Sequence, residues 1–343
     1  MNPKVSILVP VFNASKTIFR CLESIQIQTF EDFEVLIVND GSTDDSLSII
    51  ESFIVNKPCF KIFNKQNEGV AKARNFALQK ALSIYVCFVD SDDYLEANYI
   101  STLVNNLKST NSQLACCGYY DHSKYGNFKL NNYSKLETDS TDSQTFSTVI
   151  FDQIGGVLWD KMFILELIKS NSITMDLDVY YYEDSLFVLD YLKYCSKISL
   201  VSQPLYHYDR TNEDSFTSKI NFEWKTNIIL YNKSIIQKLK HFNCPQNTVD
   251  KIVSKSLFGF YQAVFSYKNL TNHTIVHSYT KANDILDSVF FESFLPFDTK
   301  FAIEKPFVFY INKKWVFCII IWSYCLEFCK IINRFFRLNA TKD

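Results

Sequence analysis

Short apolar runs alternate with segments of helical period over roughly the first 90 residues of the chain. The apolar runs lie at Val5–Val9, Val35–Val38, Phe60–Phe63 and Tyr85–Val89. The first is almost wholly apolar, as expected of a strand that is buried on both faces of a sheet, and the second repeats this pattern. Strands that alternate with helices of this length predict an α/β fold with a doubly wound, mostly parallel sheet.

The segments between these runs are expected to be helices, because their apolar residues recur every three or four positions. Ser15 is expected to cap the first helix. In the third helical segment, "NEGVAKARNFALQKAL", Arg74 shares the inner face with Ala77 and Leu78. This is an unusual place for an arginine that would only face solvent, so Arg74 is a candidate functional residue.

Polar residues follow the end of each predicted strand. They are Asn13, Asn39–Asp40, Asn67 and Asp90–Asp93. Ligands of parallel α/β sheets bind at the carboxyl ends of the strands. The sequence therefore predicts one functional rim that gathers these side chains.

The remainder of the chain is less regular. Residues 123–148 are rich in Ser, Thr and Asn and predict a loop. Helical periodicity dominates after about residue 218, so we expect a first domain over 1–218 and a helical region over 219–343.

An apolar run near the end of the chain, Trp315–Leu326, would span about 18 Å as a helix, short of the ~30 Å hydrocarbon core of a bilayer. A narrow polar stripe with basic residues follows it. We predict an amphipathic helix at about 315–338 that lies on the membrane surface. A core helix packed on the domain is the alternative.

Composition excludes several classes of protein. A net charge of −2 gives no reason to expect nucleic-acid binding. The ten cysteines lack the spacing of zinc sites, and the first residues lack the features of a signal peptide. We therefore expect free thiols in a reducing cytosol. No GxGxxG or GxxxxGK[ST] motif occurs, which argues against Rossmann dehydrogenases and P-loop enzymes.

The most informative stretch is "YVCFVDSDDYL", in which a buried strand ends in the carboxylates of Asp90, Asp92 and Asp93. Like charges this close repel one another, so a cation is expected among them. Taken alone, a DSDD sequence is more often a turn or the start of a helix.

Three motifs together resemble those of family 2 inverting glycosyltransferases with the GT-A fold. They are "VSILVPVFNASKTIFRCLESIQIQTFEDFEVLIVNDGSTDDS", "NEGVAKARNFAL" and "VCFVDSDD". The resemblance is dense over about the first 100 residues and continues more sparsely to about residue 218. It is strongest to bacterial enzymes that assemble capsule, lipopolysaccharide or other surface polysaccharides. It implies a hexosyltransferase-type enzyme of EC 2.4 that uses a nucleotide-sugar and a divalent cation, Mn²⁺ or Mg²⁺.

By this resemblance, "DSDD" contains the family's DxD motif and binds the donor through Asp90, Ser91 and Asp92. Asp92 would be a metal ligand, and Asp90 would face the ribose or contact the metal through water. The cation would act as a Lewis acid on the departing diphosphate. Arg74 would brace the nucleotide or the aspartate cluster, although a structural ion pair with one aspartate is an alternative.

The same resemblance implies that the nucleobase of the donor binds at the ends of the first two strands. Asp40 would accept a hydrogen bond from uracil, and Pro10 and Phe12 would frame the base. A simple Asx-turn before the next helix is the alternative for Asp40.

"YYYEDSLF" matches the ED motif of the family. Asp184 would be the general base that takes the proton of the acceptor hydroxyl, and Glu183 would shape the pocket or orient Asp184. In isolation, Asp184 would be interpreted as a helix N-cap or a first-turn acid.

The resemblance extends to further residues. His207 in "LYHYDR" would complete the metal shell, with a half-buried strand histidine as the alternative. Arg210 resembles part of a loop that closes on the donor diphosphate. In "GGVLWDKMF", Gly156 would permit close backbone approach, and Trp159 or Lys161 would touch the donor sugar or the acceptor.

We therefore expect a metal-dependent inverting glycosyltransferase that moves a sugar from a nucleotide donor to a lipid-linked saccharide at the inner face of the cell membrane. The resemblance implies that the donor is UDP-linked. A nucleotidyltransferase acting on sugar phosphates is one alternative. It typically needs a glycine-rich basic loop after the first strand, which "VPVFNASKT" is not. A non-catalytic GT-A-fold membrane scaffold is the other, and the presence of both Asp92 and Asp184 argues against it.

Overall fold

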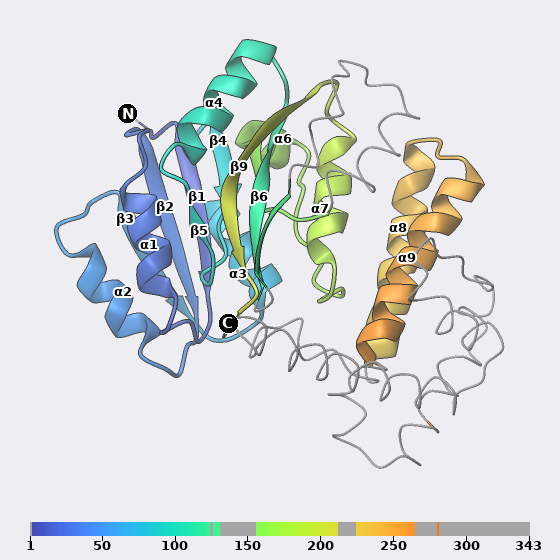
Figure 1. The fold of residues 1–343 in the computed structure, drawn as a ribbon, viewed down its shortest axis with the longest axis horizontal. Helices are drawn as coiled ribbons and strands as arrows, with labels where there is room; N and C mark the ends of the chain where they lie inside the picture. Colours follow the sequence, from blue (N-terminus) through green and yellow to red (C-terminus); the bar gives the residue numbers. More distant parts are fainter. Residues whose placement is uncertain (1, 124–125, 131–155, 212–223, 265–279, 281–343) are drawn as a thin grey trace, which may run out of the picture. The chain divides into compact units, whose positions relative to one another are not determined.

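Figure 1 shows the computed structural model, which describes residues 2–123, 126–130, 156–211, 224–264 and 280. The described residues belong to two compact units. The first unit contains the described residues of 1–213 and 237–244, and the second unit contains the described residues of 214–236 and 245–343. The domain boundary expected near residue 218 stays a prediction, and the expected helix at 315–338 lies outside the described residues, as does most of the polar stretch 123–148.

In the described part of the chain, nine strands form one sheet at the centre of the first unit. The four predicted strands are β1 (Val5–Val11), β2 (Phe33–Asp40), β3 (Phe60–Lys65) and β4 (Tyr85–Phe88). They pair in parallel in the order β3-β2-β1-β4. Every residue of β1 is buried, because helices cover both faces of the sheet here. This explains why the strand is apolar without alternation.

The other strands give the sheet mixed polarity. β8 (Lys161–Ile164) runs antiparallel between β4 and β6 (Leu114–Ser123), and β9 (Ile198–Asp209) runs parallel to β6. β5 (Tyr94–Leu95) pairs antiparallel with β9, and β7 (Gly126–Leu130) pairs antiparallel with β6. The expected α/β fold is confirmed, but only the first half of the sheet is uniformly parallel.

Helices connect the strands of the first unit. They are α1 (Ile18–Gln26), α2 (Ser46–Ile54), α3 (Val70–Lys80), α4 (Tyr99–Thr110), α6 (Leu165–Ser170) and α7 (Glu183–Leu192). α1 buries its predicted apolar face in the core. The predicted cap at Ser15 is wrong, because the helix begins only after Thr17 and the Ser15 N–H donates to Asp44 Oδ2 at 2.9 Å.

Two longer helices follow, α8 (Lys225–His241) and α9 (Gln246–Val264), in agreement with the helical periodicity of this region. A buried hydrogen bond from Ser256 Oγ to Asn232 Oδ1 (2.5 Å) joins them. Among the helices described here, none combines the length and the apolar character needed to cross a lipid bilayer.

Candidate active site

The DSDD segment follows β4 and is held in place by the end of β9. The hydroxyl of Tyr206 donates to Asp93 Oδ2 (2.7 Å) and accepts the N–H of Asp90 (3.2 Å). The N–H of Asp209 donates to Asp93 Oδ1 (2.8 Å). Asp93 is therefore fully buried as a structural anchor, while Asp90 and Asp92 remain only partly buried. We call residues 90–93 the acidic tip.

The acidic tip carries more negative charge than its surroundings compensate. Burial, with the neighbouring Asp90 carboxylate, raises the pKa of Asp92 to about 6. Burial also raises the pKa of Asp93 well above its usual range, and the charges of Asp92 and Asp90 add to this. Both shifts mean that a second negative charge is unfavourable here in the absence of a cation.

The residues present fit a divalent cation that binds to one carboxylate of the protein and to phosphate oxygens of a substrate. No other residue that the structure describes donates a hydrogen bond to the Asp92 carboxylate, which leaves its oxygens available. Within the described ranges, no group of three or more His, Cys, Asp or Glu side chains is arranged to hold a metal alone. Mg²⁺ characteristically binds one or two carboxylates together with substrate phosphates, which matches a single available carboxylate.

Arg74 of α3 joins the acidic tip to the start of α7. Its Nη2 donates to Asp90 Oδ1 (2.9 Å), and its Nη1 donates to Glu183 Oε1 (2.9 Å) and Asp184 Oδ1 (2.6 Å). The Arg74 side chain is 6% exposed, so these ion pairs are largely shielded from water. The structure thus contains the ion pair that the sequence left open, with three carboxylates rather than one. Contact of Arg74 with a nucleotide stays a prediction.

Glu183 and Asp184 form the first turn of α7, directly after Tyr182 in the left-handed conformation (φ 68°). The N-cap residue is Tyr182, and its side chain makes no capping hydrogen bond. Burial raises the pKa of Asp184 well above its usual range, against the lowering effect of Arg74, and the Glu183 and Asp90 carboxylates add to the rise. Burial likewise raises the pKa of Glu183. Asp184 is therefore a carboxylate of raised basicity beside the acidic tip, the property required of a general base at neutral pH.

Gly156 lies against this turn of α7. A Cβ at position 156 would stand 2.2 Å from the Cβ and 2.8 Å from the Cα of Ser185. Only a glycine allows the two segments to approach this closely. Gly156 therefore determines how near the chain before β8 comes to Asp184.

Gly156→Ala is expected to lower the free energy of unfolding by about 1–3 kcal/mol, because the first turn of α7 must move to admit the methyl group. Thermal unfolding followed by circular dichroism measures this effect. Adding Ser185→Gly removes the nearer of the two atoms and should recover part of the loss. An unchanged melting temperature in Gly156→Ala would show that the contact is not tight.

Trp159 and Lys161 lie in the interior rather than on the rim. The Trp159 ring is 5% exposed and stacks on Tyr206 at 4.5 Å between centroids. Lys161 is fully buried, with Nζ 2.6 Å from Asp160 Oδ1. Three consecutive residues of β8, Lys161 to Phe163, are buried, so both faces of this strand are covered. These placements favour structural roles over the expected contact with sugar or acceptor.

The residues expected to bind the donor base lie at the ends of β1 and β2. Pro10 is buried within β1, and Phe12 follows it with 49% of its surface exposed. Asp40 is buried, and its carboxylate accepts hydrogen bonds from Lys65 Nζ (2.7 Å) and the Gly69 N–H (2.8 Å). The carboxylate fastens β2 to the loop before α3 instead of forming an Asx-turn with its own loop. Contact with uracil stays a prediction.

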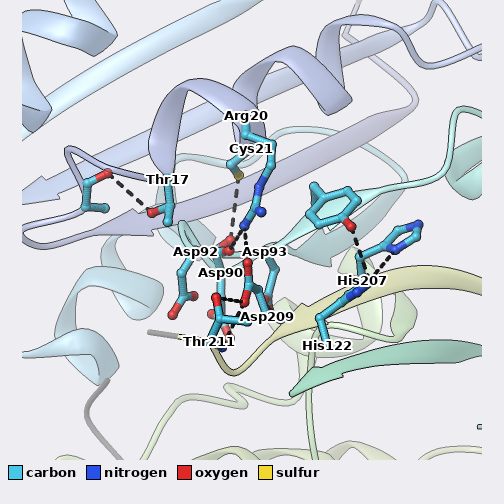
Figure 2. Close-up of polar contacts among 12 residues, drawn as sticks. Thr17, Arg20, Cys21, Asp90, Asp92, Asp93, His122, His207, Asp209 and Thr211 are labelled. Atoms are coloured by element: carbon cyan, nitrogen blue, oxygen red, sulfur yellow. Dashed lines mark hydrogen bonds and ion pairs between the residues drawn. The ribbon is translucent and has the colours of Figure 1, made fainter. Parts of the chain in front are cut away.

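The structure does not bring His207 to Asp92. One ring nitrogen lies 2.8 Å from His122 Nε2 and the other 2.9 Å from Glu96 Oε1, and the Tyr94 ring stacks on the imidazole at 4.2 Å. In Figure 2 the imidazole lies to one side of the acidic tip. Both ring nitrogens are therefore engaged, which favours the alternative of a half-buried strand histidine over the expected metal ligand.

Arg210 pairs with a neighbouring strand. Its Nε donates to Asp121 Oδ1 (2.9 Å) and its Nη2 donates to Asp121 Oδ2, while the Arg210 N–H donates to the His122 carbonyl (3.1 Å). The side chain is 51% exposed, so an anionic ligand would reach the guanidinium without unfolding of the strand. Its role at a diphosphate stays a prediction.

Sequence reasoning missed Arg20 and Asp209, which meet beside the acidic tip (Figure 2). Nη2 of Arg20 is 2.7 Å from Asp209 Oδ2 and 2.7 Å from the Asp92 carbonyl oxygen. The one available signal was the position of Asp209 directly before Arg210, at the end of a strand.

Comparison with known proteins finds matches among glycosyltransferases. The model of glycosyl transferase family 2 matches residues 6–165. The putative glycosyltransferase EpsH of Bacillus subtilis is 27% identical over 60% of this chain and 61% of its own length. The cholesterol galactosyltransferase of Borreliella burgdorferi is 27% identical over 83% of each chain. The chain thus spans less than two thirds of EpsH but most of the galactosyltransferase.

Solved structures agree in fold. The crystal structure of residues 1–349 of TarS from S. aureus, in complex with UDP-GlcNAc, has a TM-score of 0.65 and 20% identity, and the match covers 94% of this chain and 91% of that one. The mannosyltransferase PcManGT from Pyrobaculum calidifontis, in complex with GDP-Man and Mn²⁺, has a TM-score of 0.53 and 12% identity over 94% and 88% of the two chains. Residues 6–165 therefore carry a glycosyl transferase family 2 domain, whose relatives are EC 2.4 transferases, and the structure has the GT-A fold.

Proposed function

We propose that this protein is an active, metal-dependent inverting glycosyltransferase that moves a sugar from a UDP-sugar to a lipid-linked saccharide in bacterial surface-polysaccharide synthesis. The observation that carries the proposal is the link made by Arg74. One guanidinium contacts both Asp90 of the acidic tip and Asp184 of α7. A site for an anionic leaving group and a basic carboxylate therefore lie within the reach of one side chain.

In the proposed reaction, Asp184 takes the proton of an acceptor hydroxyl as its oxygen attacks the anomeric carbon. Attack from the face opposite the departing diphosphate inverts the configuration. The raised pKa of Asp184 makes it a stronger base than an ordinary aspartate, while the neighbouring Arg74 guanidinium favours its ionised form. Glu183, bound to the same Nη1 atom, fixes the orientation of the guanidinium and so of Asp184.

Asp92 would hold the divalent cation, together with phosphate oxygens of the donor. When bound, the cation would neutralise charge on the leaving diphosphate. GT-A glycosyltransferases commonly use such a cation, and PcManGT was solved with Mn²⁺. The raised pKa of Asp92 supports this assignment, because a bound cation would relieve the repulsion that causes it.

A uracil nucleotide is the proposed donor because TarS, which shares the fold, was solved with UDP and with UDP-GlcNAc. The exposed Phe12 ring beside the end of β1 offers an apolar face on which a base would stack. Base selection would then fall to the polar groups around Asp40.

A lipid-linked acceptor at the inner face of the cell membrane is proposed on two grounds. One relative is named for transfer to cholesterol, a membrane lipid. The sequence 315–338 also combines an apolar run with a basic stripe, as in helices that lie in a membrane surface. An acceptor anchored in the bilayer would confine the reaction to that surface.

The donor is tested by a thermal-shift screen of UDP-, GDP- and dTDP-sugars with Mn²⁺. At a concentration of 100 Kd, a ligand that binds only the folded state adds about 2.7 kcal/mol of stability. We expect UDP-sugars to raise the melting temperature by several degrees, and excess chelator to remove most of the shift. A larger shift with GDP- or dTDP-sugars would refute the uracil assignment. Release of pyrophosphate in place of UDP would identify a nucleotidyltransferase.

A further inference from the structure

Arg20 reaches from α1 to the backbone of the acidic tip, as Figure 2 shows. Its Nη2 donates both to the carbonyl oxygen of Asp92 and to Asp209 Oδ2, each at 2.7 Å. The guanidinium also lies over the Tyr94 ring, 4.5 Å from the centroid. Three elements distant in sequence, α1, the tip after β4 and the end of β9, therefore meet at one guanidinium.

Asp209 uses its two carboxylate oxygens in two directions. Oδ2 accepts the bond from Arg20, while Oδ1 accepts the N–H (2.9 Å) and the Oγ1–H (2.6 Å) of Thr211. Its own N–H donates to Asp93 Oδ1 (2.8 Å). One residue thus binds both the acidic tip and the chain that leaves β9 around Arg210.

The Arg20–Asp209 pair contributes little to global stability. The Arg20 side chain is 42% exposed, and ion pairs with such exposure typically contribute about 0–1 kcal/mol. The local effect is larger, because Asp92 is anchored through its carbonyl oxygen while its carboxylate lacks a hydrogen-bond donor from any other residue described. The direction of that carboxylate depends on how firmly the Asp92 peptide is held.

We propose that Arg20 and Asp209 are positioning residues. They hold the Asp92 peptide so that its carboxylate faces the cation and diphosphate of the donor, and they connect this geometry to the chain around Arg210. The proposal deepens the proposed function and rests on it for the identity of the ligand. Neither residue needs to touch the ligand.

The test uses Arg20→Gln, Asp209→Asn and the double variant in the full chain. Hydrogen exchange of the unliganded proteins reports order at the tip, through the Asp93 N–H bonded to the Asp90 carbonyl and the Asp209 N–H bonded to Asp93. Titration calorimetry with Mn²⁺ and UDP reports ligand affinity. Lys4→Gln is the matched control, since it breaks another exposed ion pair, Lys4–Asp32, next to the opposite end of β1.

We expect each single variant to accelerate exchange at both amides about tenfold and to raise the Kd for UDP with Mn²⁺ about tenfold, with nearly unchanged melting temperatures. The double variant should bind UDP with Mn²⁺ no more weakly than the single variant of lower affinity, since both changes break the same contact. Lys4→Gln should match the wild type.

Unchanged exchange at the tip in both single variants would overturn the proposal, as would losses of affinity that multiply in the double variant. If the wild type binds no UDP, the proposed donor is wrong, and the exchange rates alone then decide whether the pair orders the tip. The two failures are thereby distinguishable.

Discussion

Replacing Asp184 with asparagine is expected to lower kcat for sugar transfer by about 10²–10⁴-fold, the usual contribution of a general base. Asparagine has nearly the same size and can still accept the hydrogen bond from Arg74, but it cannot take up a proton. The rate of UDP release with a saturating acceptor measures the effect. Affinity for UDP with Mn²⁺ should change little, because the base acts on the acceptor.

Asp190→Asn is the matched control, since it makes the same chemical change on the same helix. Asp190 pairs with Lys193 at 2.6 Å. Lys193 follows the end of α7, and Lys238 of α8 also pairs with Asp190 at 2.5 Å; in the described residues neither pair contacts the acidic tip. The control should retain nearly full activity. A full rate in Asp184→Asn would exclude Asp184 as the base, whatever the result for Asp190.

The raised pKa of Asp184 also predicts the shape of the pH profile. Only the ionised carboxylate can act as base, so kcat/KM should fall as the pH falls through this pKa. Burial places that limb above the pH range of an ordinary aspartate. Arg74→Lys should move the limb to still higher pH, because one ammonium nitrogen cannot replace both Nη1, which pairs with Glu183 and Asp184, and Nη2, which pairs with Asp90. A profile flat down to pH 4 would contradict this assignment.

The parallel half of the sheet was predictable because its strands are buried on both faces. β1, β2 and β4 therefore stand out as apolar runs, whereas β3 lies at the edge of the sheet and is only partly buried, and the polar residues after these strands mark the rim. Arg74 was also recognisable, because an arginine on the inner face of a helix needs anionic partners. The identity of those partners was only partly available, since Glu183 and Asp184 lie more than 100 residues further along the chain.

The faces of β9 could not be predicted from alternation alone. Its pairing with β6 shifts register between Cys117 and Tyr119, so simple counting does not show which side chains face the acidic tip. Tyr206 faces Asp93, whereas His207 turns to His122 and Glu96. His207 therefore lies in a cluster with His122 and Glu96 in this structure, and its role as a metal ligand stays a prediction.

Arg20 and Asp209 were missed for a related reason. Their contact joins residues 189 positions apart, and the bond from Arg20 to Asp92 spans 72 positions. On α1, Arg20 lies beside the buried face rather than on it, and an arginine there is usually interpreted as solvent-facing. Only the tertiary structure shows that this part of α1 passes over the acidic tip.

Replacing Asp92 with asparagine is expected to produce a protein that is more stable but much less active. Burial raises the pKa of Asp92 from 3.8 to about 6, so the folded state binds a proton more tightly than the unfolded state. The ionised carboxylate consequently destabilises the unliganded fold above pH 6. Removing it should add about 1–3 kcal/mol of stability at pH 8 and little at pH 4, where the group is protonated in the folded state.

The same substitution removes the proposed ligand of the divalent cation. We expect transfer to fall by about 10²–10³-fold, the scale seen when one group that stabilises transition-state charge is lost. Excess chelator should reduce the wild type to a similar rate and change Asp92→Asn little further. Melting curves at pH 8 and pH 4, transfer assays and Mn²⁺ titrations of the same samples measure all the expected effects.

The combination of higher stability and lower activity separates a functional carboxylate from a structural one. Replacing a structural aspartate that accepts hydrogen bonds, such as Asp93, should instead destabilise the fold. Asp45→Asn is the charge-matched control, because Asp45 is exposed and makes no side-chain cap at the start of α2. If Asp92→Asn kept full, chelator-resistant transfer, the acidic tip would not be a metal site. If its melting temperature fell at pH 8, the carboxylate would instead be part of the structural framework.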